Sequence, residues 1–196
     1  MSREHPPAVV IIAAAATAVS VVVFLGGPRL GYLPGIVFSA IVGLLILWRF
    51  RPSLSMSWLV AVLLAAYYLG GAVVVGDDVM AHLHLGNDIL RYDRGIHVLG
   101  ALITVLLVAE IARGRKAVSG VIVLAIAAGA GLLVESVELF TALGLPGLFS
   151  YDIVDSSLDV VGNTVGLALG FVALVLARRR PLAERAARSV QQARYD

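Results

Sequence analysis

Acidic and imidazole side chains stand inside or at the ends of segments that are apolar enough to cross a membrane. These residues are Asp93, His97, Glu135, Glu138 and Asp159. Each charged side chain placed at the centre of a bilayer costs about 2.5–3.5 kcal/mol. The acids must therefore be protonated, paired with a base or bound to a cation, and polar groups kept inside a membrane usually serve its function.

The spacing of these residues predicts shared helix faces. Members of the following groups are three or four residues apart: Asp93 and His97; Glu135 and Glu138; Asp155, Asp159 and Asn163. Side chains at that spacing project from one face of an α-helix. Acids outnumber the neighbouring bases Arg91, Arg94 and His97. Either at least one carboxylate keeps its proton, with the two glutamates titrating as a coupled pair, or a cation completes the site.

The elements that carry these groups are predicted to be membrane helices. Hydrophobic residues make up 60% of the 196-residue chain, charged residues 14%, and the mean hydropathy is +0.95. This composition excludes a soluble protein and indicates an all-α membrane bundle. Six spans are predicted, at about 8–25, 34–48, 58–75, 95–112, 118–141 and 157–177, where about 20 residues suffice to cross. They form one bundle over 1–177, followed by a basic tail over 178–196. With no cysteine, disulfides and thiolate chemistry are excluded.

Basic residues set the predicted orientation. Most Lys and Arg residues lie in the two terminal segments and in the second and fourth predicted loops. The first, third and fifth loops hold only Arg29, Arg91 and Arg94. The positive-inside rule therefore puts both termini in the cytoplasm and the acidic loops outside. The first segment has a competing interpretation as a signal peptide, because Ala13–Ala16 offers small residues. We favour a retained span because the apolar run continues to Leu25.

In this topology three helices deliver polar groups to one shallow level near the outer face. At 1.5 Å per residue, His97 and Asp159 lie about 5 Å from the outer helix ends and Glu135 about 9 Å. The predicted ligand-binding residues are Asp93, Arg94, His97, Glu135, Glu138, Asp152, Asp155, Asp159 and Asn163. The metal-ligand candidates among them are His97, Glu135, Glu138 and Asp159, and a divalent cation is the candidate cofactor.

Some of these residues also have purely structural interpretations. Asp152, Asp155 and Asp159 straddle the start of a predicted helix, where carboxylates cap free N–H groups. That explanation fails for Glu138, which lies near the C-terminal end of its helix. The His82-x-His84 pair lies in a polar outer loop, where we favour solvated side chains over ligands.

Small residues recur on the last predicted span. Gly162, Gly166 and Gly170 fall at every fourth position, a pattern that lets another helix backbone approach closely. Tight packing of this helix would fix Asp159 and Asn163 against the carboxylates of the preceding span. In the tail, Arg178, Arg179 and Arg180 form a basic flank that suits contact with anionic lipid.

Four pieces in the second half resemble one family pattern. They are Tyr92-Asp93-Arg94-x-x-His97-x-x-Gly100, Glu135-x-x-Glu138, Tyr151-Asp152 and Asp159-x-x-Gly162-Asn163-x-x-Gly166. In this order they resemble the VanZ-like and YjdF-type small membrane proteins, over about 88–170. VanZ-like members tend to carry a glutamine and a downstream arginine where this chain has Glu138 and no arginine between Glu138 and Arg178. The resemblance therefore leans toward the YjdF-type branch, most of whose relatives have no assigned reaction.

Three classes of function remain open. Ranked first is a non-catalytic membrane protein whose outward-facing polar site binds a cation, a lipid headgroup or an envelope component. The second is an acid–base or metal-assisted enzyme acting on a lipid-linked or envelope substrate, with Glu135, Glu138 and His97 as catalytic candidates. The third is a proton- or cation-coupled transporter, disfavoured because transporter sites usually lie near mid-membrane between repeats. We expect a prokaryotic plasma-membrane location, contact with membrane lipid and no nucleic-acid partner; the oligomeric state is left open.

Overall fold

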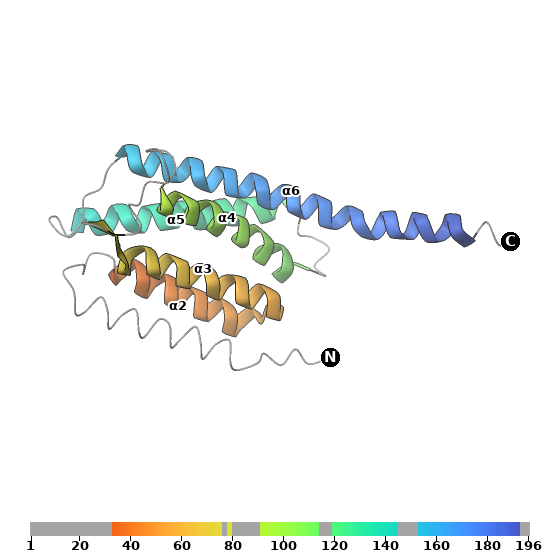
Figure 1. Cartoon of the computed structure of the whole chain (residues 1–196), viewed down its shortest axis with the longest axis horizontal. Helices are drawn as coiled ribbons and strands as arrows, with labels where there is room; N and C mark the ends of the chain where they lie inside the picture. Colours follow the sequence, from red (N-terminus) through yellow and green to blue (C-terminus); the bar gives the residue numbers. More distant parts are fainter. Residues whose placement is uncertain (1–32, 76–77, 80–90, 114–118, 145–152, 193–196) are drawn as a thin grey trace.

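Helices make up nearly all of the regular structure. A computed structural model describes residues 33–75, 78–79, 91–113, 119–144 and 153–192. The helices are α2 (Leu33–Phe50), α3 (Leu54–Ala72), α4 (Tyr92–Ile111), α5 (Gly120–Gly144) and α6 (Ile153–Gln192), shown in Figure 1. A short antiparallel pair, β1 (Val74–Val75) and β2 (Asp78–Val79), follows α3. The prediction of an all-α fold is confirmed for the described residues. The first predicted span, Asp152 and the His82-x-His84 pair lie outside them.

Three of the described helices are long and apolar enough to cross a membrane. The qualifying segments are Tyr92–Ile111, Gly120–Phe140 and Ile153–Ala177, and they overlap the last three predicted spans. The apolar stretches Val37–Phe50 and Leu54–Gly70 are shorter. Six spans and the cytoplasmic placement of both termini stay predictions.

Helix α6 is longer than the predicted last span at both ends. It begins at Ile153, before the expected position 157, and continues to Gln192 as a helix of 40 residues. The residues predicted as a basic tail from 178 onward therefore continue this helix as far as 192. At 1.5 Å per residue, 40 residues extend about 60 Å, roughly twice the thickness of a bilayer's hydrocarbon core.

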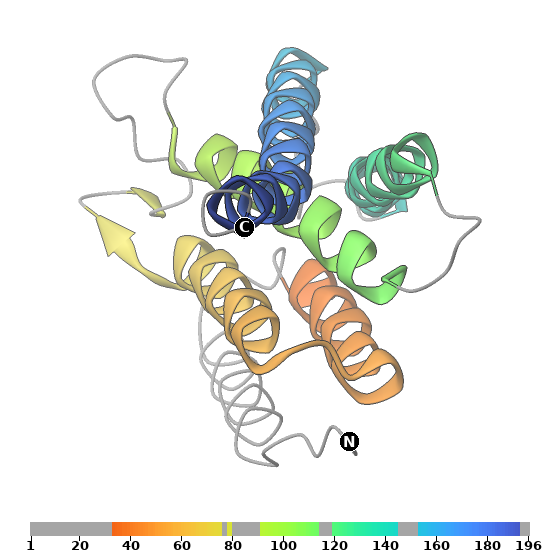
Figure 2. The ribbon, with the colours of Figure 1, turned by 90° about the vertical axis from the view of Figure 1, so that its right-hand side faces the viewer.

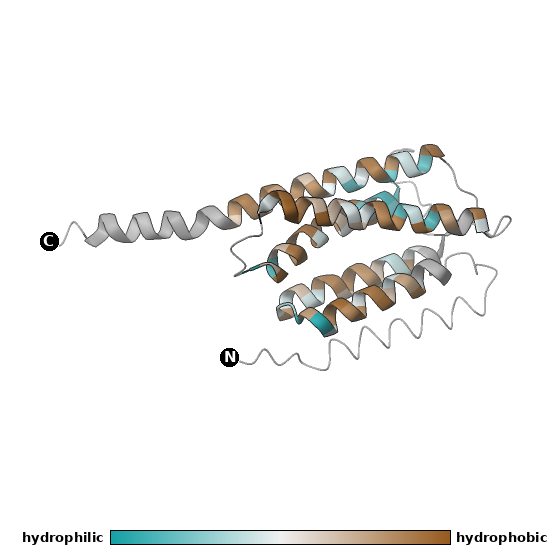
Figure 3. Cartoon of the chain, turned by 180° about the vertical axis from the view of Figure 1, so that it is seen from behind, coloured by the Kyte–Doolittle hydropathy of each residue, from teal (hydrophilic) through white to brown (hydrophobic). Residues whose placement is uncertain are grey.

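Large apolar side chains lie on the outside of the described helices. Val121 is 75% exposed, Phe140 72% and Leu132 60%. Figure 3 shows hydrophobic residues along the lengths of α4, α5 and the first half of α6, with hydrophilic residues toward the helix ends. A soluble monomer rarely leaves so much contiguous apolar surface exposed, whereas lipid-facing helices require it.

Helix α4 packs on both sides and links two small cores. One core joins it to α2 and α3 through Leu47, Met56, Val60, Ile103 and Leu107. The other joins it to α5 and α6 through Val105, Val123 and Ala127, with Leu167 and Leu174 packed against them. Figure 2 shows α4 between the α2–α3 pair and helices α5 and α6. This central position makes α4 the element against which the others are aligned.

Helices α4 and α6 run in the same direction and touch through glycines. A Cβ atom at Gly166 would lie 2.2 Å from the carbonyl oxygen of Val98, and one at Gly170 would lie 2.8 Å from Cβ of Val105. The contact at Gly162 is looser, since its Cβ would lie 3.4 Å from the Arg94 carbonyl oxygen. These contacts fix the axial position of α6 on α4, and the first turns of the two helices lie side by side.

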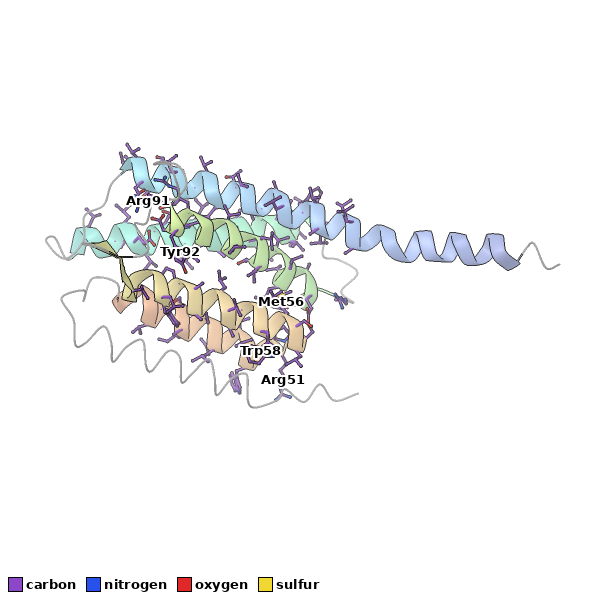
Figure 4. The ribbon with its side chains drawn as sticks, viewed as in Figure 1. Arg51, Met56, Trp58, Arg91 and Tyr92 are labelled. Carbon is purple, nitrogen blue, oxygen red and sulfur yellow. The ribbon has the colours of Figure 1, made fainter. Side chains whose placement is uncertain are left out.

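The two ends of the bundle are held by different contacts. At the start of α4, the Tyr92 hydroxyl donates a hydrogen bond of 2.8 Å to the Ala66 carbonyl of α3. At the end of α4, the Glu110 carboxylate accepts hydrogen bonds from the backbone N–H and the hydroxyl of Ser53, which caps α3. Figure 4 shows Tyr92 at one end of the bundle and Trp58 at the other. The polar site described below lies at the Tyr92 end.

Candidate metal centre

Polar side chains at the Tyr92 end lie at two levels, and the level nearer the helix ends is an arginine–aspartate network. Arg91 donates to Asp155 Oδ1 at 2.8 Å and to Asp93 Oδ2 at 2.7 Å. Arg94 also donates to Asp155 Oδ1, at 2.8 Å. Asp93 in addition accepts a hydrogen bond of 2.8 Å from the Arg94 backbone N–H, which suits a carboxylate in the first turn of a helix. Two guanidinium groups and two carboxylates leave this level balanced in charge.

One helical turn deeper, the His97 imidazole lies between two carboxylates from different helices. Its Nδ1 is 3.5 Å from Glu135 Oε1 of α5, and its Nε2 is 3.8 Å from Asp159 Oδ2 of α6. Both separations exceed the length of an ordinary hydrogen bond. The antiparallel course of α5 brings a residue near its C-terminal end to the same depth as residues near the start of α4 and α6. We call His97, Glu135 and Asp159 the triad.

Both carboxylates of the triad are buried and incompletely hydrogen-bonded. The Glu135 side chain is 10% exposed and the Asp159 side chain 9%. Glu135 Oε2 and Asp159 Oδ1 find no hydrogen-bond partner among the described residues. A buried polar atom without a partner costs about 1–3 kcal/mol, and more when it carries charge. Unlike the arginine–aspartate level, the triad contains more acid than base.

The donor atoms of the triad lie close enough to share a metal ion. One atom from each residue can be chosen such that all three lie within 4.8 Å of one another. Bonds of about 2.0–2.2 Å to a tetrahedral Zn²⁺ place its donors about 3–3.5 Å apart, so a small inward movement of the side chains completes the geometry. One imidazole and two carboxylates suit Zn²⁺ or Mn²⁺. Three protein ligands leave at least one coordination position for a water or ligand oxygen.

Two further predicted site residues adjoin the triad. Asn163, one turn beyond Asp159 on α6, donates a hydrogen bond to Glu135 Oε1 at 3.5 Å. Glu138, one turn beyond Glu135 on α5, is partly buried and close enough to His97 and Asp159 to interact with them electrostatically. It is not one of the three clustered donors. The structure therefore distinguishes between the two glutamates, which sequence spacing treats alike.

The predicted site residues thus divide into separate groups. His97, Glu135 and Asp159 come together with Asn163, whereas Arg94, Asp93 and Asp155 satisfy one another at the neighbouring level. Asp152 lies outside the described residues. The predicted ligand set left out Arg91, which joins Asp93 to Asp155. Its position directly before the first turn of a helix that carries Asp93 is the sequence signal for that role.

Comparisons of the chain with protein-family models, with curated proteins and with solved structures find no match. The resemblance to the VanZ-like and YjdF-type membrane proteins therefore stays a prediction based on the four motif pieces alone.

Proposed function

We propose that this protein is a multi-pass protein of a prokaryotic plasma membrane whose last three helices bind a divalent cation, Zn²⁺ or Mn²⁺, through His97, Glu135 and Asp159. The proposal makes the cation part of an outward-facing polar site, as the distribution of basic residues predicts. The exposed apolar surfaces of α4, α5 and α6 support the membrane location. Membership of the VanZ-like or YjdF-type group is part of the same proposal and rests on the motif resemblance.

The observation that carries the cation proposal is the pair of buried carboxylate oxygens without partners, Glu135 Oε2 and Asp159 Oδ1. A divalent cation compensates two carboxylates at once and supplies the missing interaction to both. Burying an uncompensated charge is strongly unfavourable, and the neighbouring arginines are already engaged with Asp93 and Asp155. A cation is therefore the partner that the chemistry of this pocket favours.

Metal analysis of the purified protein tests the proposal. The protein in detergent is stripped with a chelator, re-equilibrated with Zn²⁺ or Mn²⁺ and freed of excess ion, and its metal content is measured by mass spectrometry. We expect about one ion per chain in the wild type, which is the stoichiometry of a single three-ligand site. Asp159→Asn should lose the ion. Glu110→Gln is the matched control, because this carboxylate lies at the other end of α4 and contacts Ser53.

Two results would contradict the proposal. A wild-type protein that keeps no ion after re-equilibration would show that the triad is not a metal site. An Asp159→Asn protein that binds as much metal as the wild type would place the ion elsewhere. Thermal unfolding of each variant checks that a variant without metal is still folded.

A further inference from the structure

A cavity of about 220 Å³ lies between α5 and α6 and shares a wall with the triad. Glu135 and Asn163, which hydrogen-bond to each other, line its polar end. Farther from the triad, Ala127, Ala128 and Leu167 line it, so that the rest of the wall is largely apolar. The cavity therefore joins a buried carboxylate to a largely apolar wall.

Small side chains create this space. Gly131 and Ala128 face it from α5. A Cβ atom at Gly131 would lie only 3.4 Å from the Asn163 side chain, so a larger residue there would press against the polar end. At 1.5 Å per residue, the distance along α5 from Glu135 to Ala127 is about 12 Å. This length accommodates a substantial part of an extended alkyl chain.

The rim of the cavity opens on the outer surface of the helices. Leu132 is 60% exposed and Val160 41%, and Thr164 beside them is also exposed. These residues belong to the same apolar surface that the proposed membrane location turns toward lipid. An occupant can therefore enter sideways from the bilayer without passing through water.

We infer that the cavity binds a hydrocarbon chain of a membrane lipid whose phosphate headgroup coordinates the cation held by the triad. The inference rests on the proposed function, since it uses the coordination position that three protein ligands leave open. The lining matches the two parts of such a molecule: apolar walls take the chain, and the charged end at Glu135 takes a cation-bound oxygen. A lipid also explains why the space opens toward the apolar surface. A fully polar ligand would offer no apolar surface to the apolar wall of the cavity.

Short-chain phosphatidic acid tests the inference on the intact protein in detergent. Wild-type protein, loaded with Zn²⁺ or Mn²⁺, is titrated with dioctanoyl phosphatidate and separately with glycerol 3-phosphate, which has the same phosphate but no chain. Binding is followed by calorimetry. We expect the lipid to bind about a hundredfold more tightly than glycerol 3-phosphate, since burial of only a few methylene groups is needed for that difference.

Filling the cavity should remove the higher affinity that the hydrocarbon chain gives the lipid over glycerol 3-phosphate. Ala128→Phe places a large ring in the space, and Ala130→Phe is the matched control, because Ala130 is exposed on the same helix and does not line the cavity. Thr164→Leu narrows the rim from α6 and serves as a second variant that leaves α5 untouched. We expect Ala128→Phe and Thr164→Leu to bind metal like the wild type and to lose the preference for lipid, while Ala130→Phe keeps it.

The outcomes separate this inference from the proposed function. If metal binds as proposed but glycerol 3-phosphate binds as well as the lipid, or both cavity variants retain the lipid preference, the inference is overturned and the metal site stands. If the wild type binds no metal, the proposed function fails, and the inference fails with it.

Discussion

Gly166 of α6 approaches Val98 of α4 so closely that a Cβ on Gly166 would lie 2.2 Å from the Val98 carbonyl oxygen. That contact involves a backbone atom, which cannot move aside as the end of a flexible side chain can. The contact fixes the axial position of α6 relative to α4. One consequence is that Asp159 lies beside His97, two turns before the contact on α6. The arrangement of the triad therefore depends on a residue that has no side chain.

Gly166→Ala should destabilise the protein by about 2 kcal/mol or more, because the added methyl group forces the two helices apart. Gly129→Ala is the control, since a Cβ there would meet nothing within 4 Å. Without a clash, replacing glycine by alanine inside a helix raises the free energy of unfolding by about 0.5–1 kcal/mol. Thermal unfolding in detergent measures both. An equal effect of the two substitutions would contradict the close approach of α6 to α4.

Glu135→Gln and Glu138→Gln should differ in their effect on cation binding, although the two residues are one turn apart. The first removes a donor from the triad, whereas the second leaves all three donors in place. We expect Glu135→Gln to weaken Zn²⁺ or Mn²⁺ binding more than Glu138→Gln does, and the loss in Glu138→Gln to stay within the about 10–100-fold that is typical of residues outside the ligand set. Competitive titration against a metal indicator measures both affinities. The reverse order would assign the ligand to Glu138.

Asp155→Ala should destabilise the fold by about 2 kcal/mol, because both Arg91 and Arg94 lose the carboxylate oxygen they share. The groups are partly exposed, so water compensates some of the loss. Ser157→Ala on the same turn is the control, since among the described residues its hydroxyl donates only to the Ile153 carbonyl. Unfolding experiments compare the two. If Asp155→Ala also abolished metal binding without lowering stability, Asp155 would be a ligand.

Cation binding should release protons and weaken as the pH falls. Imidazole must be neutral and carboxylates ionised to act as ligands, so protons compete with the metal for the triad. For each proton released, the affinity should fall about tenfold per pH unit in the range where that proton binds. Calorimetry in two buffers with different ionisation enthalpies counts the protons. Binding that released none would indicate that the ion contacts only groups already free of protons, such as backbone carbonyls.

Much of this arrangement follows from the sequence, because helix periodicity and depth are local properties. The four-residue spacing of Asp155, Asp159 and Asn163 places them on one face of α6, and the three helices bring polar groups to one end of the bundle. The choice of Glu135 over Glu138 does not follow from spacing. It depends on the rotation of α5 about its axis, which selects Glu135 over Glu138, and that rotation is set by side-chain packing between helices.

The lengths of the helices were also only partly predictable. Hydropathy ends the last span near Ala177, where the arginines begin, yet the backbone of α6 continues to Gln192. Arginine and alanine, which are abundant after 177, are good helix formers, so the loss of hydrophobicity does not end the helix. Conversely, hydropathy begins the last span at 157, whereas α6 begins at Ile153 and carries Asp155 in its first turn. A carboxylate in the first turn stabilises a helix N-terminus.

The position of α6 after α4 and α5 in the chain has a consequence for biosynthesis. His97 and Glu135 are synthesised first, and the ribosome must add α6 before either can meet Asp159. Until then the nascent chain holds an imidazole and a glutamate without their common neighbour. Among the described helices α6 is synthesised last and closes the polar pocket, so truncation before Asp159 should leave a product that quality-control proteases recognise.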